Sequence, residues 1–301
     1  MSIDGTTQLV GVVGWPVAQT LSPAMHNAAF SYSGLNWRYV ALPARSEHLP
    51  AAIRGLGALG FRGVNITVPH KVDVIPLVDT ITEAATIVGA VNTIRIDRNS
   101  GQIEGLNTDM SGFLTDIATN RINVDKNSRV LILGAGGAAR AVAAGLVRTG
   151  AQVMVVNRTP EHAQMLVMFI KSSWAQNNID FVYMENLFEA SRGATLIVNT
   201  TPVGQWPDVE ASPWPENVPL PKEAVLYDIV YRPMKTRLMR DAEAAGLRTI
   251  GGLGMLVYQG AAAFEVWTGK KAPVDIMKMI LIQALSEASP STPAPNLVND
   301  D

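Results

Sequence analysis

The chain has 301 residues, of which 48% are hydrophobic and 17% are charged, and its formal net charge is −2. This composition predicts a folded α/β protein of about two domains and excludes a largely disordered chain. The near balance of acids and bases argues against a nucleic-acid partner, and no apolar run reaches the length of a membrane span. The first residues lack the positive charge of a secretory signal.

Cysteine and histidine usage narrows the possible chemistry. The chain has no cysteine, which excludes disulfides, thiolate nucleophiles and cysteine metal sites and suits a reducing compartment such as the cytoplasm. The four histidines, His26, His48, His70 and His162, lie far apart in the sequence. We therefore expect no metal site.

Strand and helix patterns alternate in the first 120 residues. We predict strands over 8–13, 37–42, 62–68, 90–97 and 102–107, the last two joined by a hairpin-like turn. We predict helices that open at Ser22, run over 46–60, extend from about Lys71 to Gly89, and cover about 111–120. Ser22 suits an N-cap and Pro23 the first helical position. In the third strand Val64, Ile66 and Val68 alternate with smaller or polar residues, and Pro69 ends the strand.

A polar linker over 119–128 precedes a second alternating series. We predict strands over 129–133, 151–156, 194–199 and 224–230, and helices over 136–150, 160–174, 254–269 and 273–287. The segment 202–221, rich in Pro and Trp, is predicted to be a long surface loop, and the tail 289–301 is predicted to be disordered. Alternation of this kind indicates parallel sheets with crossover helices.

The segment VLILGAGGAARAV, residues 130–142, predicts a dinucleotide phosphate loop. A buried strand leads into Gly134, Gly136 and Gly137, and an alanine-rich helix follows, with Ala139 at the third position of the glycine motif. Glycines permit the tight turn and the close approach of a pyrophosphate, and the helix N-terminus offers free N–H groups. A tight turn without a ligand is the alternative.

The end of the next strand indicates which dinucleotide binds. An acid about 20 residues after the glycines normally binds the ribose 2′-hydroxyl of NAD, but this chain has Asn157, Arg158 and Thr159 there. A guanidinium can stack on adenine and pair with a 2′-phosphate. We therefore expect NADP to be preferred, with a solvated loop arginine as the alternative.

Four polar segments follow or flank the strands outside the nucleotide segment: 20–23, 65–71, 91–93 and 107–109. Because ligands bind beyond the carboxyl ends of parallel strands, we expect these segments to converge on one site. Lys71 and Asp109 are the candidates for chemistry there. An ammonium stabilises charge that develops on a carbonyl oxygen, and a carboxylate orients the lysine and can share its proton. A surface ion pair without function is the alternative.

The motifs GVVGWPVAQTLSPAMHNAAF, NITVPHK, GAVNT, NTD, GAGGAAR, NRT and GGLGMLVYQGAAAF occur in this order over nearly the whole chain. Together they resemble the shikimate dehydrogenase family. The resemblance implies that Lys71 and Asp109 form the catalytic pair. It implies that the substrate is contacted by six residues: Thr20, Ser22, Thr67, Asn92, Tyr231 and Gln259. Of these, Thr20 and Ser22 would hold the substrate carboxylate. It implies cofactor contacts from Gly134, Ala135, Gly136, Gly137, Ala138, Asn157, Arg158, Thr159, Thr200 and Gly252.

Three positions depart from the family pattern. Thr20 stands where serine is usual and keeps the hydroxyl. His162 stands where many NADP-dependent relatives carry a second basic residue, and Met110 follows Asp109 where glycine is frequent. We interpret His70 as a packing residue, His26 as a residue on a helix face, and Gln259 as a residue that could instead bond neighbouring backbone.

The resemblance implies an oxidoreductase acting on a CH–OH group, which reversibly reduces 3-dehydroshikimate to shikimate with NADPH in aromatic amino-acid biosynthesis. It implies an α/β fold of two domains: a substrate-binding domain over 1–110, completed by helices over 254–288, and an NADP-binding Rossmann-type domain over 111–253. A monomer or homodimer is expected. The alternatives are a quinate/shikimate dehydrogenase that uses NAD, an aminoshikimate-type relative, and a non-catalytic dinucleotide-binding protein.

Overall fold

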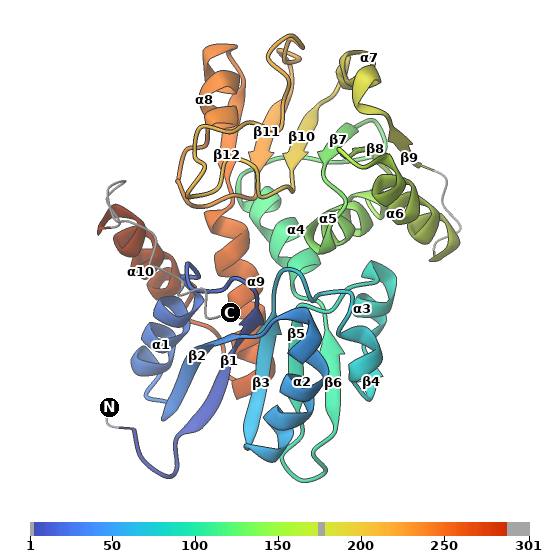
Figure 1. The fold of residues 1–301 in the computed structure, drawn as a ribbon. Coiled ribbons are helices and arrows are strands. Elements are labelled where there is room, and N and C mark those ends of the chain that lie inside the picture. The colour runs from blue at the N-terminus through green and yellow to red at the C-terminus, as the bar shows by residue number, and fades with distance from the viewer. Residues whose placement is uncertain (1–2, 174–177, 288–301) are drawn as a thin grey trace, which may run out of the picture.

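A computed structural model describes residues 3–173 and 178–287, so the predicted tail lies outside the described residues. The chain forms two domains, each built on a six-stranded sheet, and the first and last described elements, β1 (Gln8–Gly14) and α10 (Val274–Glu287), both belong to the first domain (Figure 1). Helix α4 (Asp109–Thr119) and the first part of α9 (Leu253–Thr268) lie between the two sheets (Figure 1). Within the described residues, no helix is long and apolar enough to cross a bilayer.

The first sheet has the strand order β2-β1-β3-β5-β6-β4. Its strands are β1 (Gln8–Gly14), β2 (Trp37–Pro43), β3 (Phe61–Ile66), β4 (Thr80–Ile81), β5 (Thr93–Ile96) and β6 (Ile103–Leu106). Most of its strand pairs are parallel, but β5 runs antiparallel to both β3 and β6, and its pairing with β6 confirms the predicted hairpin. The predicted turn reverses the chain: Asp97 Oδ1 accepts hydrogen bonds from the backbone N–H groups of Asn99 and Ser100.

Helices cover both faces of this sheet. They are α1 (Ser22–Tyr32), α2 (Leu49–Ala58), α3 (Glu83–Val88), α9 (Leu253–Thr268) and α10 (Val274–Glu287). One core joins α1, α9 and α10 to residues such as Val10 and Tyr39, and a second joins α2 to Val13 and Ile66. These alternating strand residues face opposite layers, as the two-residue period of a strand requires.

Three local predictions in this domain are wrong. Ser22 is the first residue of α1, not its cap; Leu21 holds the cap position without a side-chain hydrogen bond. β3 ends at Ile66, and Val68 is 67% exposed. The predicted helix from Lys71 is replaced by turns, a 3-10 turn over Ile75–Leu77 and β4, with only α3 helical. Pro76, which lacks a backbone N–H, interrupts the helical hydrogen-bond pattern in this region.

The second sheet is parallel throughout, with the order β12-β11-β10-β7-β8-β9. Its strands are β7 (Arg129–Leu133), β8 (Gln152–Val156), β9 (Ile179–Val182), β10 (Leu196–Asn199), β11 (Val225–Asp228) and β12 (Arg248–Gly251). Val130 and Ile132 face a core that contains α5 (Gly137–Val147) and α6 (Pro160–Ser173). Leu131 and Leu133 face the core of α7 (Leu187–Ser191) and α8 (Arg237–Ala244). This is the doubly wound arrangement expected of a dinucleotide domain.

The linking helix α4 (Asp109–Thr119) packs tightly against α9. A Cβ atom on Gly112 would lie 2.7 Å from the backbone nitrogen of Gln259, and one on Gly254 would collide with the Asp116 carboxylate. Asp116 in turn accepts a 2.5 Å hydrogen bond from the Tyr227 hydroxyl in β11. Glycine therefore permits the close approach of the two helices, and Asp116 ties their crossing to the nucleotide sheet.

Candidate active site

Lys71 and Asp109, distant in sequence, meet in a buried ion pair. The Lys71 ammonium donates to Asp109 Oδ2 at 2.6 Å, and the two side chains are only 15% and 6% exposed. Asp109 is the first residue of α4, where a carboxylate is favoured by the helix dipole. This burial argues against a solvated surface pair.

Asn92 holds Asp109 in place. Its amide nitrogen lies 2.8 Å from Asp109 Oδ1 and 2.9 Å from Thr108 Oγ1, and its Oδ1 accepts from the Thr108 backbone N–H at 2.7 Å. Asn92 stands directly before β5. Because β5 is antiparallel, its start lies at the same sheet edge as the end of β3, which carries the chain to Lys71. A backbone bond from Val91 N–H to Lys71 carbonyl oxygen, 2.8 Å, fixes the two segments together.

Hydroxyl groups form a second polar cluster at this edge. Thr20 Oγ1 donates to Ser22 Oγ at 3.2 Å, and the Ser22 hydroxyl lies within hydrogen-bonding reach of the Tyr39 phenol. The Tyr39 hydroxyl donates to Asn65 Oδ1 at 2.8 Å. Tyr231 lies near Tyr39, and burial raises the pKa of the Tyr231 phenol. The cluster thus contains both predicted carboxylate-binding hydroxyls, with Tyr231 close by.

The hydroxyl cluster connects with the ion pair through the interior. Asn65 Nδ2 donates to the Asn92 carbonyl oxygen at 3.2 Å and to Thr93 Oγ1 at 3.1 Å. Thr93 in turn bonds Asn92 Oδ1 at 3.1 Å. A continuous chain of hydrogen bonds therefore runs from Ser22 to Asp109, and each member restrains the orientation of the next.

Gln259 and Thr67 flank this network. Gln259 Oε1 lies 3.5 Å from Asn92 Nδ2, while its Nε2 donates to the Leu256 carbonyl at 2.8 Å. Gln259 therefore bonds neighbouring backbone through its nitrogen, which was one of its two interpretations from the sequence. Its side-chain oxygen points toward Asn92. Thr67 is partly buried; its backbone N–H donates to the Val13 carbonyl at 2.9 Å, which sets its place beside β1.

Both interior histidines lie outside the ion pair. His70 is fully buried and its Nε2 is 2.7 Å from the Ala44 carbonyl oxygen, in agreement with a packing role. His26 is fully buried on α1 and its ring stacks on Tyr39 with centroids 4.4 Å apart. Burial lowers the pKa of His26 to about 3, so the ring is neutral at physiological pH.

The glycine loop joins β7 to α5 as predicted. The Gly134 N–H donates to the Val156 carbonyl at 2.8 Å, and Gly134 has φ +108°, a conformation that favours glycine. Gly136 caps α5 without a side-chain hydrogen bond, and a Cβ there would meet nothing within 4 Å. The first N–H groups of α5 are thus open to an anion, and the loop fits a dinucleotide pyrophosphate.

The other predicted cofactor residues lie in this loop or follow the carboxyl ends of other strands in the same parallel sheet. Thr200, after β10, donates its hydroxyl to the Leu133 carbonyl at 2.6 Å and lies against Gly134. Arg158 and Thr159 follow β8 and are exposed, and Asn157 Nδ2 donates to the Thr159 carbonyl at 2.8 Å. Gly252, just before α9, abuts the Ile229 backbone so closely that a side chain would clash. Ala135 and Ala138 lie within the same loop and first turn.

One contact brings the two halves of the site together. A Cβ atom on Gly137 would lie 2.9 Å from Lys71 Cδ and 3.0 Å from Lys71 Cβ. The methylene groups of the lysine therefore lie against the N-terminus of α5, and the ammonium continues to Asp109. The edge of the first sheet and the phosphate loop of the second face each other across this contact.

Sequence reasoning missed the buried residues that support the site. Tyr39, Asn65, Thr93 and Thr108 make bonds within the network that connects Ser22 to Asp109. Three of them lie in the segments predicted to converge but were given no role of their own, and Tyr39 lies outside those segments. The available signal was a polar side chain inside an apolar strand, such as Asn65 between Val64 and Ile66.

Comparisons with known protein families cover most of the chain. Residues 12–94 match the shikimate dehydrogenase substrate binding domain, and residues 116–205 match the shikimate / quinate 5-dehydrogenase family. Residues 252–282 match the shikimate 5′-dehydrogenase C-terminal domain.

Individual relatives match over nearly their full length. The shikimate dehydrogenase (NADP(+)) of Methanopyrus kandleri is 41% identical over 95% of this chain and 98% of its own. A solved shikimate dehydrogenase in complex with NADP+ superposes with a TM-score of 0.88 at 36% identity, over 94% of this chain and 98% of that one. The shikimate 5-dehydrogenase of Thermus thermophilus, in complex with NADP(H) and shikimate, gives a TM-score of 0.81 at 38% identity, over 93% of this chain and 100% of that one.

Proposed function

Because the chain belongs to the shikimate dehydrogenase family, we propose that it catalyses the reversible NADPH-dependent reduction of 3-dehydroshikimate to shikimate in aromatic amino-acid biosynthesis. The observation that carries the proposal is the buried Lys71–Asp109 pair, which lies between the phosphate loop and the hydroxyl cluster. NADPH supplies the hydride when it is bound.

Lys71 is proposed to bond the reacting oxygen of the substrate. Its ammonium has three hydrogens, of which Asp109 takes one at 2.6 Å. The others can bond the carbonyl oxygen of the substrate, stabilise the charge that develops there and pass a proton to it. Asp109 keeps the ammonium in position, and Asn92 keeps Asp109 in position.

Thr20 and Ser22 are proposed to hold the substrate carboxylate, with Tyr231 close by. Their hydroxyls lie within 3.2 Å of each other and can turn to donate to an anion. Thr67, Asn92 and Gln259 are proposed to bond the ring hydroxyls. Of these, Asn92 and Gln259 already approach each other at the ion pair, which supports a shared substrate contact.

The cofactor is proposed to lie along the second domain. The open N-terminus of α5 fits the pyrophosphate, and Arg158 carries the only side-chain positive charge among Asn157, Arg158 and Thr159. An exposed guanidinium without an acid in this position suits a 2′-phosphate. We include in the proposal a substrate domain of 1–110 with helices 254–288, a cofactor domain of 111–253, a cytoplasmic location, and a monomeric or homodimeric state.

Steady-state kinetics with shikimate and quinate, each with NADP and NAD, test the proposal. We expect kcat/KM to be highest for shikimate with NADP. Higher efficiency for quinate with NAD would establish the quinate alternative, and no oxidation of either substrate would establish a non-catalytic relative.

A further inference from the structure

A cavity of about 580 Å³ lies at the edge of the first sheet opposite the proposed active site. Its lining comes from the amino ends of parallel strands, with Gln8 of β1, Trp37 of β2 and Arg62 of β3, and from the end of the antiparallel β5. The proposed active site lies at the carboxyl ends of β1 and β3. Ligands in the two places would therefore not overlap.

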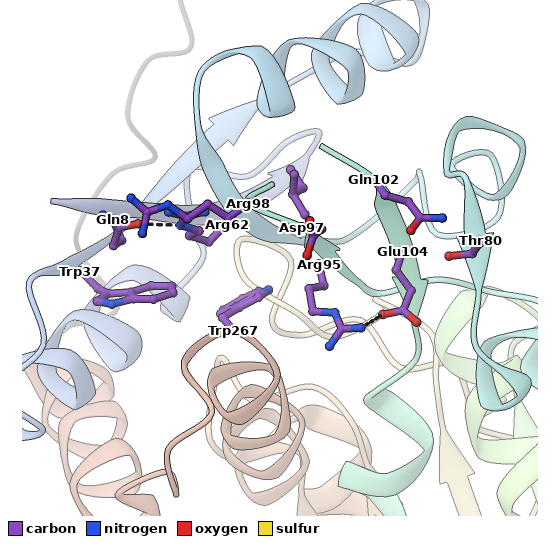
Figure 2. A pocket seen from close by; sticks show the side chains of 11 residues that line it. Gln8, Trp37, Arg62, Thr80, Arg95, Asp97, Arg98, Gln102, Glu104 and Trp267 are labelled. Carbon is purple, nitrogen blue, oxygen red and sulfur yellow. Dashed lines mark hydrogen bonds and ion pairs between the residues drawn. The ribbon is translucent and has the colours of Figure 1, made fainter. Parts of the chain in front are cut away.

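The cavity combines cations with aromatic rings. Figure 2 shows Arg62 and Arg98 on one side of the indole rings of Trp37 and Trp267, while Arg95 turns away to Glu104. Arg95 is neutralised by that contact, 2.7 Å long. Trp267 Nε1 donates to the Ile94 carbonyl at 2.9 Å, so this indole offers the cavity its ring and no free donor.

Arg62 and Arg98 keep uncompensated donors. Arg62 uses its Nε to bond Gln8 Oε1 at 2.6 Å, which leaves its terminal nitrogens available. In the part of the chain that the structure describes, no carboxylate lies within ion-pair distance of either guanidinium. Burial and, to a smaller extent, repulsion from Arg98 lower the pKa of Arg62. An anion between the two groups would relieve this repulsion.

The nearby acid Asp97 is already engaged. It lines the cavity and attracts Arg62, but its Oδ1 accepts bonds from Asn99 N–H, Ser100 N–H and the Ser100 hydroxyl within the turn. Asp97 therefore offsets part of the positive charge without closing the cavity. Two planar guanidinium groups remain beside two indoles.

We propose that this cavity is a binding site for a small aromatic carboxylate. Guanidinium groups pair with carboxylates through planar forks, and indole rings stack or pack edge-on against another aromatic ring. The two features lie next to each other, so one ligand that carries both groups can use both.

Benzoate is the probe, and the indole N–H signals of Trp37 and Trp267 in ¹H–¹⁵N NMR spectra are the readout. The titration is made with saturating shikimate and repeated on Ser22→Ala without shikimate, so that occupancy of the substrate site is separated from occupancy of the cavity. We expect benzoate to shift both signals in both experiments. Shifts that vanish under either condition would assign benzoate to the substrate site and overturn the proposal.

Paired variants and probes test the two halves of the recognition. We expect Arg98→Gln to bind benzoate about tenfold more weakly, the change for loss of one charge-assisted contact. Arg54→Gln, which removes an exposed charge from α2 outside the cavity, should bind benzoate like the unaltered protein. Equal affinities of the two variants, or binding of benzyl alcohol or acetate as tight as that of benzoate, would overturn the proposal.

Discussion

At the scale of the single residue, the position of Lys71 predicts a large and selective catalytic effect. In Lys71→Ala the ammonium next to Asp109 is lost, and with it the proposed proton donor and the positive charge proposed to stabilise the reacting oxygen. We expect kcat to fall by about a thousandfold. NADPH affinity, measured by fluorescence titration, should stay within about twofold, since the phosphate loop remains.

Lys222→Ala is the matched control, because Lys222 is exposed directly after the loop 202–221 and forms no ion pair in the described part of the chain. Its kinetics should equal those of the unaltered protein. Retention of full turnover in Lys71→Ala would show that another group protonates the substrate.

We predict that Arg158 determines the preference for NADPH over NADH and has little effect on turnover with NADH. The Arg158→Gln substitution removes an exposed guanidinium that the proposal places on the 2′-phosphate. We expect kcat/KM for NADPH to fall about tenfold and that for NADH to change little, because NADH has no 2′-phosphate. Arg129→Gln is the control for the loss of one positive charge. Arg129 is the first residue of β7 and therefore lies at the sheet edge opposite the one that carries Arg158. An equal loss with both cofactors would assign Arg158 to structure instead.

Asp228 predicts a pH dependence of stability. This fully buried carboxylate accepts bonds from Asn199, Thr236 and the Val230 N–H, yet burial raises its pKa to about 6. Its ordinary value is 3.8. Because the folded state binds the proton more tightly, this group's contribution is most favourable at low pH and is lost as pH rises through about 6.

Urea unfolding at pH 4 and pH 7 measures this contribution against Asp228→Asn, in which the group does not titrate. Between these pH values the unaltered protein should lose about 2 kcal/mol of unfolding free energy relative to the variant. Parallel pH profiles for the two proteins would mean that the carboxylate is not perturbed.

At the scale of the element, the crossing of α4 and α9 depends on a missing side chain. Alanine is normally a better helix former than glycine by about 1 kcal/mol. At Gly112, however, its Cβ would lie 2.7 Å from the Gln259 backbone nitrogen. We expect Gly112→Ala to reduce the unfolding free energy by about 2 kcal/mol, because the two helices are forced apart.

Gly55→Ala in α2 is the matched control. A Cβ at Gly55 would meet nothing within 4 Å, so the helix preference acts alone. Its unfolding free energy should rise by up to about 1 kcal/mol. Opposite signs for the two variants in the same denaturation assay establish the packing effect, and equal signs exclude it.

The elements that the sequence predicts well are long or strongly apolar. The strands of 129–133 and 151–156, the glycine-loop helix and α9 were all predicted, because burial on both faces leaves a continuous apolar pattern. β9, β12 and α8 were not predicted. β12 has four residues and begins with a polar pair, and α8 has eight residues, too few for a clear period.

The sequence allowed us to predict the reactive residues of the site, but not the hydrogen bonds that connect them. Lys71 and Asp109 are conspicuous in the sequence because few charged residues lie in the polar motifs that follow or flank the apolar strands. The bonds from Asn92 to Asp109 and from Tyr39 to Asn65 were not predictable, since each joins elements whose contact depends on the antiparallel insertion of β5 or on the packing of β1, β2 and β3. Local patterns carry no information on such pairings.

At the scale of the whole molecule, the proposed activity depends on the contact of Lys71 with the phosphate loop of the other domain. Gly136 and Gly137 are neighbours in the phosphate loop, but they face different surroundings. A Cβ on Gly136 would enter open space that the proposal assigns to the pyrophosphate, whereas a Cβ on Gly137 would press on the methylenes of Lys71 from the other domain.

The two alanine variants should therefore fail in different ways. Gly136→Ala should weaken NADPH binding about tenfold, because the backbone can no longer approach the phosphates closely. Gly137→Ala should instead lower kcat about tenfold with a smaller change in NADPH affinity, since displacement of Lys71 by a few tenths of an ångström alters the geometry of proton transfer. Fluorescence titration and single-turnover kinetics measure the two effects separately. Loss of binding alone in both variants would mean that the loop serves only the cofactor, and that Lys71 adapts to the added methyl group without cost to the reaction.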